Sequence, residues 1–221
     1  MLLFKRFTLP ILLVLLSVSV GFAQKKKKKD EVVTITTPQG EIKLILYDET
    51  PKHKENFLKL AKEGYYDGTT FHRIIENFMI QGGDANSKDS DPNNDGMGNI
   101  GYLIPAEITP ELKHVRGAVA AARTNNPEKA SSGSQFYIVQ NEFGTPFLDG
   151  NYTVFGQAIA GLEVVDDIAR QPKDFRDRPK TDVKMTVKVE TMKKKKITKT
   201  YGYQYPGTTE TKSKFKIKKR G

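Results

Sequence analysis

The stretch that decides the fold is FHRIIENFMIQGGD, residues 71–84. It sets one arginine, Arg73, and one glutamine, Gln81, among large apolar and β-branched residues, where packing alone would favour apolar side chains throughout. Alternate side chains of a strand share a face, so we expect Phe71, Arg73 and Ile75 to point the same way. The asparagine in the middle and the glycine pair near the end allow turns that bring Gln81 back beside Arg73. The pattern predicts an apolar pocket around a guanidinium group.

Arg73 limits the chemistry of such a pocket. Its guanidinium keeps its proton, so it cannot act as a general base, but it can hold a fixed fork of donors against a carbonyl oxygen or an amide nitrogen. Taken alone, Arg73 fits a structural salt bridge better than a catalytic role. The functional interpretation therefore depends on the sequence blocks around it.

Two further blocks accompany the first one. GAVAAAR at residues 117–123 is followed by SQFYI at 134–138, and FLDGNYTVFG occupies residues 147–156. Together and in this order, the three blocks resemble the cyclophilin-type peptidyl-prolyl isomerases over residues 31–192. The resemblance implies a mainly β fold, namely a closed eight-stranded β-barrel capped by two α-helices. It also implies an isomerase that needs no cofactor and no metal.

Periodicity agrees with that fold where it can be followed. Apolar residues alternate with mostly polar ones over residues 42–47 and 183–190, which predicts strands. Thr50 followed by Pro51 is typical of a helix start, and Gly64 lies where that helix would end. The spacing of apolar residues predicts a second helix over 161–169.

By resemblance, Arg73 is the catalytic donor to the prolyl nitrogen, and Gln81 orients it. The remaining residues implied to bind substrate are Phe78, Met79, Ala122, Arg123, Gln135, Tyr137, Phe147, Leu148 and Tyr152. Ala122 and Arg123 would offer backbone groups to the residues before proline. Tyr137 stands where many relatives have Phe, so its hydroxyl needs a partner if it is buried. Phe147 and Tyr152 replace the Trp and His of eukaryotic relatives, as bacterial relatives often do.

Other candidate ligands point to no metal site. The three histidines lack metal-ligand spacing, and the chain has no cysteine. Acidic and amide side chains cluster at residues 84–95, but the glycine and glutamate positions of an EF-hand are missing. We therefore expect a solvated loop over residues 85–99 rather than a calcium loop.

The N-terminus is typical of an exported protein. Lys5 and Arg6 precede an apolar run from Phe7 to about Val20, which ends in small residues at Gly21 and Ala23. The run is shorter than the roughly 20 residues of a membrane-spanning helix. We predict a signal peptide at 1–23, cleavage before Gln24, no stable membrane span after cleavage, and a periplasmic or secreted protein. The alternative is an uncleaved anchor.

Charge is distributed unevenly along the chain. The formal net charge is +10, yet residues 30–192 hold 18 Lys and Arg against 25 Asp and Glu. The excess lies in a basic linker at 24–30 and a basic extension at 193–221, as in solvated tails. Alternating residues from Ile197 to Ile217 permit an amphipathic hairpin in that extension. We expect contact with an anionic surface there and no specific nucleic-acid site.

The sequence thus predicts a monomeric isomerase of about 160 residues that acts on X-Pro bonds of proline-containing polypeptides during the folding of exported proteins. One alternative is a proline-binding chaperone or scaffold with incidental turnover, which would use the same pocket. A third interpretation is an electrostatic adaptor whose tails hold nucleic acid or another acidic polymer.

Overall fold

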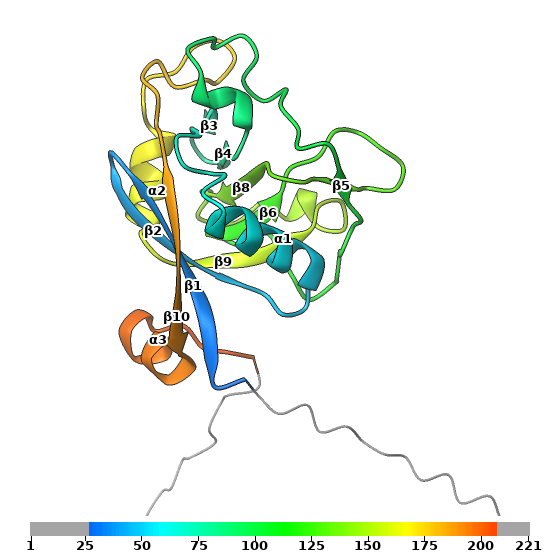
Figure 1. The fold of residues 1–221 in the computed structure, drawn as a ribbon, viewed down its shortest axis with the longest axis vertical. Helices are drawn as coiled ribbons and strands as arrows, with labels where there is room; N and C mark the ends of the chain where they lie inside the picture. Colours follow the sequence, from blue (N-terminus) through cyan, green and yellow to red (C-terminus); the bar gives the residue numbers. More distant parts are fainter. Residues whose placement is uncertain (1–26, 207–221) are drawn as a thin grey trace, which may run out of the picture.

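The computed structural model describes residues 27–206, which are built around one large antiparallel sheet (Figure 1). Its eight strands follow the order β10-β1-β2-β9-β6-β8-β4-β3. Their bounds are Lys29–Thr37 (β1), Gly40–Leu46 (β2), Arg73–Ile75 (β3), Met79–Gly82 (β4), Ala118–Ala121 (β6), Phe136–Val139 (β8), Val154–Ala160 (β9) and Thr186–Lys193 (β10). Strands β5 (Leu103–Ile104) and β7 (Ser131–Ser132) form a separate two-stranded sheet.

The expected closure of the barrel is not confirmed, because the order of paired strands has two ends, β10 and β3. The chain segments just before these edge strands do meet. Thr70 and Lys184 form an isolated bridge, and the Phe71 N–H donates to the Val183 carbonyl over 3.0 Å. The sheet therefore curves nearly into a barrel and is joined at the seam by irregular backbone.

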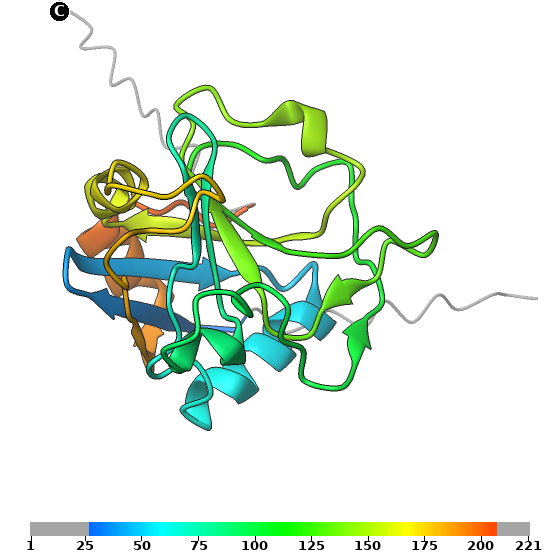
Figure 2. The ribbon, with the colours of Figure 1, turned by 90° about the horizontal axis from the view of Figure 1, so that it is seen from above.

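Two helices pack on this sheet as the sequence predicts (Figure 2). Helix α1 spans Pro51–Lys62, with Pro51 in its first turn, and α2 spans Leu162–Ala169. Both contribute to the main apolar core, where the Phe57 ring stacks on Tyr66 with centroids 4.8 Å apart. Short 3₁₀ turns, η1 (Ala85–Lys88) and η2 (Pro146–Leu148), lie in the connecting loops.

Strands β6 and β8 are buried on both of their faces. One face, with Val119 and Ile138, points into the main core, while the other carries Ala120 and Tyr137. This second face forms a separate apolar cluster on the outside of the sheet. The functional site lies on this outer cluster.

The C-terminal extension forms a third helix, so the hairpin expected there is wrong where the structure describes it. Helix α3 spans Lys194–Tyr201 and ends at Gly202, whose φ of +70° suits a helix C-terminus. Ile197 is fully buried against Val32 and Ile45 of the sheet. The alternating tyrosines imitate a strand pattern, but burial of one helix face decides the outcome.

Some predictions fall outside the described residues. These include the signal peptide at 1–23 and the part of the expected hairpin that contains Phe215 and Ile217. Between residues 27 and 206, no helix has the length and apolar character needed to cross a membrane.

Candidate functional site

Arg73 is held at the edge of the outer apolar cluster by a chain of hydrogen bonds. The strands pair Arg73 with Gln81, and Gln81 with Tyr137, so these side chains share the outer face. Arg73 Nη1 donates to Gln81 Oε1 over 3.5 Å, and Gln81 Nε2 donates to Gln135 Oε1 over 3.1 Å. Phe71, expected on the same face, instead belongs to the main core because the strand begins only at Arg73.

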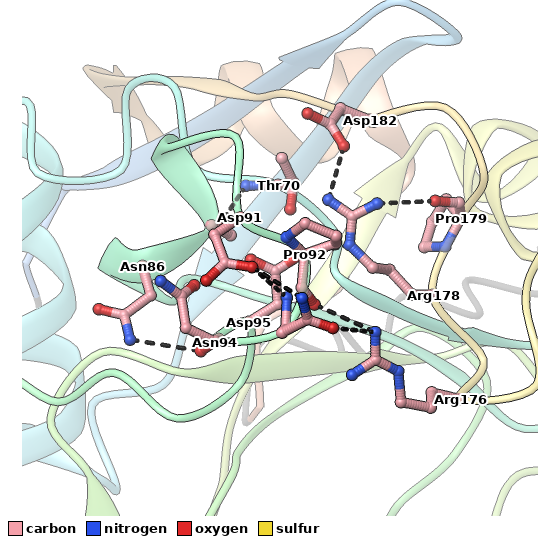
Figure 3. A network of polar contacts seen from close by, with 12 residues as sticks. Thr70, Asn86, Asp91, Pro92, Asn94, Asp95, Arg176, Arg178, Pro179 and Asp182 are labelled. Carbon is pink, nitrogen blue, oxygen red and sulfur yellow. Dashed lines mark hydrogen bonds and ion pairs between the residues drawn. The ribbon is translucent and has the colours of Figure 1, made fainter.

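The chain of hydrogen bonds continues into the 85–99 loop. Gln135 Nε2 donates to the carbonyl oxygens of Gly96 and Gly98, each over 3.0 Å. Figure 3 shows how this loop is fastened from its other side, where Arg178 lies between Asp95 and Asp182. Arg178 Nε donates to Asp95 Oδ2 over 2.6 Å, and the two side chains are only 16% and 5% exposed. The loop thus carries a largely buried ion pair behind the glycines that position Gln135.

The expectation of a solvated loop holds only in part. Asp89 and Asp91 are exposed, whereas Asp84 is fully buried and accepts from the Asn86 and Gly98 N–H groups. Within residues 27–206, no group of three or more His, Cys, Asp or Glu side chains is placed to hold a metal ion. The buried acidic residues of this segment hold the loop in place through hydrogen bonds and an ion pair.

The floor of the site is apolar. Met79, Ala122 and Tyr137 are buried in the outer cluster, and Phe78, Leu148 and Tyr152 pack against it while remaining half-exposed. The Phe147 ring is 69% exposed and stacks on Phe78 with centroids 5.8 Å apart. They come from β4, β8 and η2 and from the residues that flank β4, β6 and β9. They form a surface on which a proline ring can rest, with Phe147 at its rim.

Two neighbours border this floor on the side of Tyr152. The Arg123 guanidinium lies 4.7 Å from the centre of the Tyr152 ring, and Arg123 Nε donates to the Asn151 carbonyl over 2.9 Å. The Ala122 N–H donates to the Gln135 carbonyl, and the Ala122 carbonyl accepts from Ser132. Because a carbonyl oxygen has two lone pairs, Ala122 retains one acceptor position for a bound peptide.

The Tyr137 hydroxyl has a partner that sequence reasoning did not find. It lies 3.0 Å from His114 Nε2, and His114 Nδ1 lies 2.8 Å from Asp149 Oδ1. Burial lowers the pKa of His114, although Asp149 opposes that shift. A neutral imidazole then donates from Nδ1 to Asp149 and accepts the Tyr137 O–H at Nε2. The only sequence signal was a tyrosine that needs a partner if it is buried.

The fold therefore brings all eleven predicted site residues to one face. Arg73, Gln81 and Gln135 form its polar edge, and the aromatic and aliphatic residues form its floor. Its fixed donors lie beside an apolar surface that excludes water. Such an arrangement can bind a planar amide next to an apolar ring and stabilise charge that develops as the amide twists.

Comparison with known proteins agrees with this geometry. Residues 32–189 match the family model of the cyclophilin type peptidyl-prolyl cis-trans isomerases. Peptidyl-prolyl cis-trans isomerase-like 1 of Neurospora crassa is 41% identical, over 69% of this chain and 90% of its own length. Peptidyl-prolyl cis-trans isomerase 9 of Schizosaccharomyces pombe is 44% identical over 66% of this chain. The match covers only 23% of that longer protein, and this chain likewise spans about a third of some other relatives.

A solved structure shares the fold. The cyclophilin type peptidyl-prolyl cis-trans isomerase of Cryptosporidium parvum superposes with a TM-score of 0.64 at 33% identity. The superposition covers 73% of this chain and 98% of that one. A second crystal structure of the Cryptosporidium protein, in the presence of the dipeptide Ala-Pro, gives a TM-score of 0.63.

Proposed function

Because this chain belongs to the cyclophilin-type peptidyl-prolyl cis-trans isomerase family, we propose that it catalyses rotation about X-Pro bonds in exported proteins and so assists their folding. The observation that carries this proposal is the placement of Arg73. Its guanidinium stands at the edge of an apolar floor and is held there through Gln81 and Gln135.

The mechanism follows from the electronic structure of the amide. Resonance gives the C–N bond partial double-bond character and a rotation barrier of about 18–20 kcal/mol. Twisting the bond localises the lone pair on the prolyl nitrogen, which then accepts a hydrogen bond that it accepts poorly while planar. Arg73 donates this bond. The interaction is stronger in the transition state than in the ground state, which is the requirement for catalysis.

The magnitude shows that Arg73 does not act alone. Uncatalysed isomerisation takes tens to hundreds of seconds, so turnover in milliseconds needs a gain of about 10⁵. That gain corresponds to roughly 7 kcal/mol, whereas one preorganised donor supplies about 3–4 kcal/mol. Desolvation of the amide and orientation of the substrate relative to Arg73 supply the remainder.

The proposed address is the periplasm or the space outside the cell. Its support is sequence order alone: Lys5 and Arg6, the apolar run and the small residues up to Ala23 follow each other as in a signal peptide. Mass measurement on fractionated cells tests this. We expect an exported product that begins at Gln24, and an intact Met1 on a cytosolic product would reject the proposal.

A proline-binding chaperone or scaffold is the second candidate. The exposed Phe147 ring, stacked on Phe78, favours it because it offers apolar grip that extends beyond the catalytic edge. Both functions use the same floor, so binding of a proline peptide does not separate them. Measuring cis-trans exchange by NMR during a peptide titration does. Exchange on the millisecond scale supports the isomerase, and binding without accelerated exchange supports the scaffold.

We also propose that the basic extension contacts an anionic surface. This contact is separate from catalysis and takes no part in the proline site. Its support is the concentration of lysines outside the acidic body of the chain.

A further inference from the structure

Two lysine runs that are far apart in sequence lie side by side at one end of the molecule. Lys27, Lys28 and Lys29 lead into β1, while Lys193–Lys196 end β10 and begin α3. The strand register pairs Lys29 with Lys193, and the Lys194 N–H donates to the Lys28 carbonyl over 3.0 Å. We call these seven lysines the basic end. In Figure 1 it lies below the body of the fold, beside α3 and away from β3 and β4.

Nearby carboxylates leave most of this charge uncompensated. Asp30 and Asp48 are taken by Lys54, whose Nζ lies 3.1 and 2.8 Å from their Oδ1 atoms. Of the seven lysines, only Lys194 lies within 4.0 Å of a carboxylate oxygen among residues 27–206, and its contact with Asp30 is long at 3.8 Å. Like charges directly opposite each other in a sheet are destabilising. Such an arrangement favours an external anion.

A cavity of about 920 Å³ opens between these lysines. Tyr47, Tyr203 and Tyr205 line it together with apolar side chains of β2, and Lys27–Lys29 and Lys193–Lys195 surround them. The Tyr203 and Tyr205 rings lie 4.8 Å apart in an edge arrangement, and Lys194 Nζ lies 4.4 Å from the centre of the Tyr205 ring. Glu49 is the one lining carboxylate without a lysine partner in the described structure. The cavity therefore suits a ligand that joins an anionic group to an apolar body.

We propose that the basic end docks on an anionic lipid bilayer and that this cavity takes a phosphate-bearing headgroup. Clustered lysines attract anionic leaflets, and amphipathic tyrosine rings favour the boundary between headgroups and acyl chains. In the sequence, Lys25 and Lys26 directly precede Lys27 and so add to the charge that leads into β1. Docking in this orientation leaves the proline site, on the outer face of β4, β6 and β8, open to clients.

Vesicle partitioning tests the charge part of this proposal. The protein is used as its cells process it, with vesicles of phosphatidylcholine alone or with 30% phosphatidylglycerol. Binding should require the anionic lipid and weaken with salt. Replacing Lys29, Lys193 and Lys195 by Gln should lower the partition coefficient about 100-fold, because each replacement removes the attraction of one lysine to the anionic surface.

A matched triple variant controls for net charge. Lys59, Lys180 and Lys184 are exposed and lie elsewhere on the fold, so their replacement by Gln should change partitioning less than about threefold. Equal losses in the two triple variants would overturn a localised basic end. Isomerisation of a short peptide should stay within about twofold in both variants, because none of these lysines belongs to the proline site.

The cavity needs a test of its own. Tyr203→Ser removes a lining ring, and we expect partitioning to fall about fivefold to tenfold while Tyr203→Phe retains it. If Tyr203→Ser does not fold, Tyr203→Leu replaces it in the test, because leucine keeps apolar bulk but has no ring. No loss in either ring-deleted variant would overturn the headgroup site. Two results would overturn the bilayer as partner. One is tighter binding to a single-stranded oligonucleotide than to vesicles at equal phosphate concentration. The other is full competition by millimolar glycerol phosphate.

Discussion

The proline site and the basic end differ in whether their polar groups have partners within the described protein. At the proline site Arg73 contacts Gln81, Gln81 contacts Gln135, and Gln135 contacts two loop carbonyls. At the basic end, only one of seven lysines has a described carboxylate partner. Internal partners fix a donor in place before a substrate arrives, which suits catalysis. Charges without internal partners favour an external one, which suits docking. The following predictions test that contrast.

The largest effect should come from removing the fixed donor. Arg73→Ala should lower kcat/KM by about 10² to 10³, the scale for loss of one preorganised donor, while a proline peptide still binds. Arg73→Lys should rescue little, because its point charge lacks the planar fork. NMR titration and exchange measurements on the same samples check both outcomes. Near-normal exchange in Arg73→Ala would show that the proposed mechanism is wrong.

Leu148→Ala is the matched control for that experiment. Leu148 packs on the outer cluster, so its contacts with a proline ring persist throughout the reaction. Its truncation should weaken peptide binding and kcat/KM together, by about tenfold each, with kcat nearly unchanged. A selective loss of kcat would instead mean that Leu148 helps to form the transition state.

A smaller effect is expected at the far end of the same hydrogen-bond chain. Arg178→Gln breaks the buried pair with Asp95 and loosens the loop whose carbonyls hold Gln135. We expect kcat/KM to fall about threefold to tenfold with KM changed less, since poor positioning reduces catalysis from a distance. Arg176→Gln is the control. Arg176 is exposed and contacts the same loop only through Asn93 and Pro92, so activity should be retained.

Local sequence signals predicted the parts of the fold that local physics determines. Helix α1 starts at a proline in its first turn, and α2 repeats apolar residues at helical spacing. The site residues converge because strands β4, β6 and β8 are neighbours, which the three blocks implied by resemblance. The two helices need no knowledge of distant contacts, whereas the convergence of the site residues follows only from the resemblance.

The rest depended on tertiary packing. Helix α3 forms because Ile197 finds an apolar surface made by Val32 and Ile45, although its sequence alternates like a strand. His114 meets Tyr137 and Asp149 across 23 and 35 residues of chain, and no spacing rule joins them. The seam of the sheet is made by irregular backbone, so no strand pattern could report whether it closes.

Acid should destabilise the fold through its three histidines, one of which, His114, contacts Tyr137 of the proline site. Burial lowers the pKa of His53, His72 and His114 from the ordinary value of 6.5. The native state thus binds fewer protons than the unfolded state, so stability is full above about pH 6.5 and declines as pH falls below it. The slope is at most about 1.4 kcal/mol per pH unit for each histidine.

Urea unfolding at pH 7.5, 6.5 and 5.5 measures this decline. His114→Gln should flatten the curve by the share of one histidine, because glutamine does not titrate. A free energy of unfolding that stays constant down to pH 5.5 would contradict the assignment of neutral buried histidines.

The smallest effect should come from deleting residues 207–221, which follow the described residues. On sequence alone, removal of 193–221 would be expected to leave the isomerase intact. The structure moves that boundary, since α3 lies within the deleted part and its Ile197 covers Val32 and Ile45.

Deleting 207–221 should therefore change isomerisation less than about twofold and barely affect the melting temperature. Deleting 193–221 should expose the apolar surface under Ile197 and destabilise the fold by about 2–5 kcal/mol, the range for losing a buried aliphatic side chain. Thermal unfolding of the two truncations, with activity measured where each is folded, separates the cases. Equal stability in both would mean that α3 contributes nothing to the fold, and the cavity between α3 and the sheet could not then persist as a binding site.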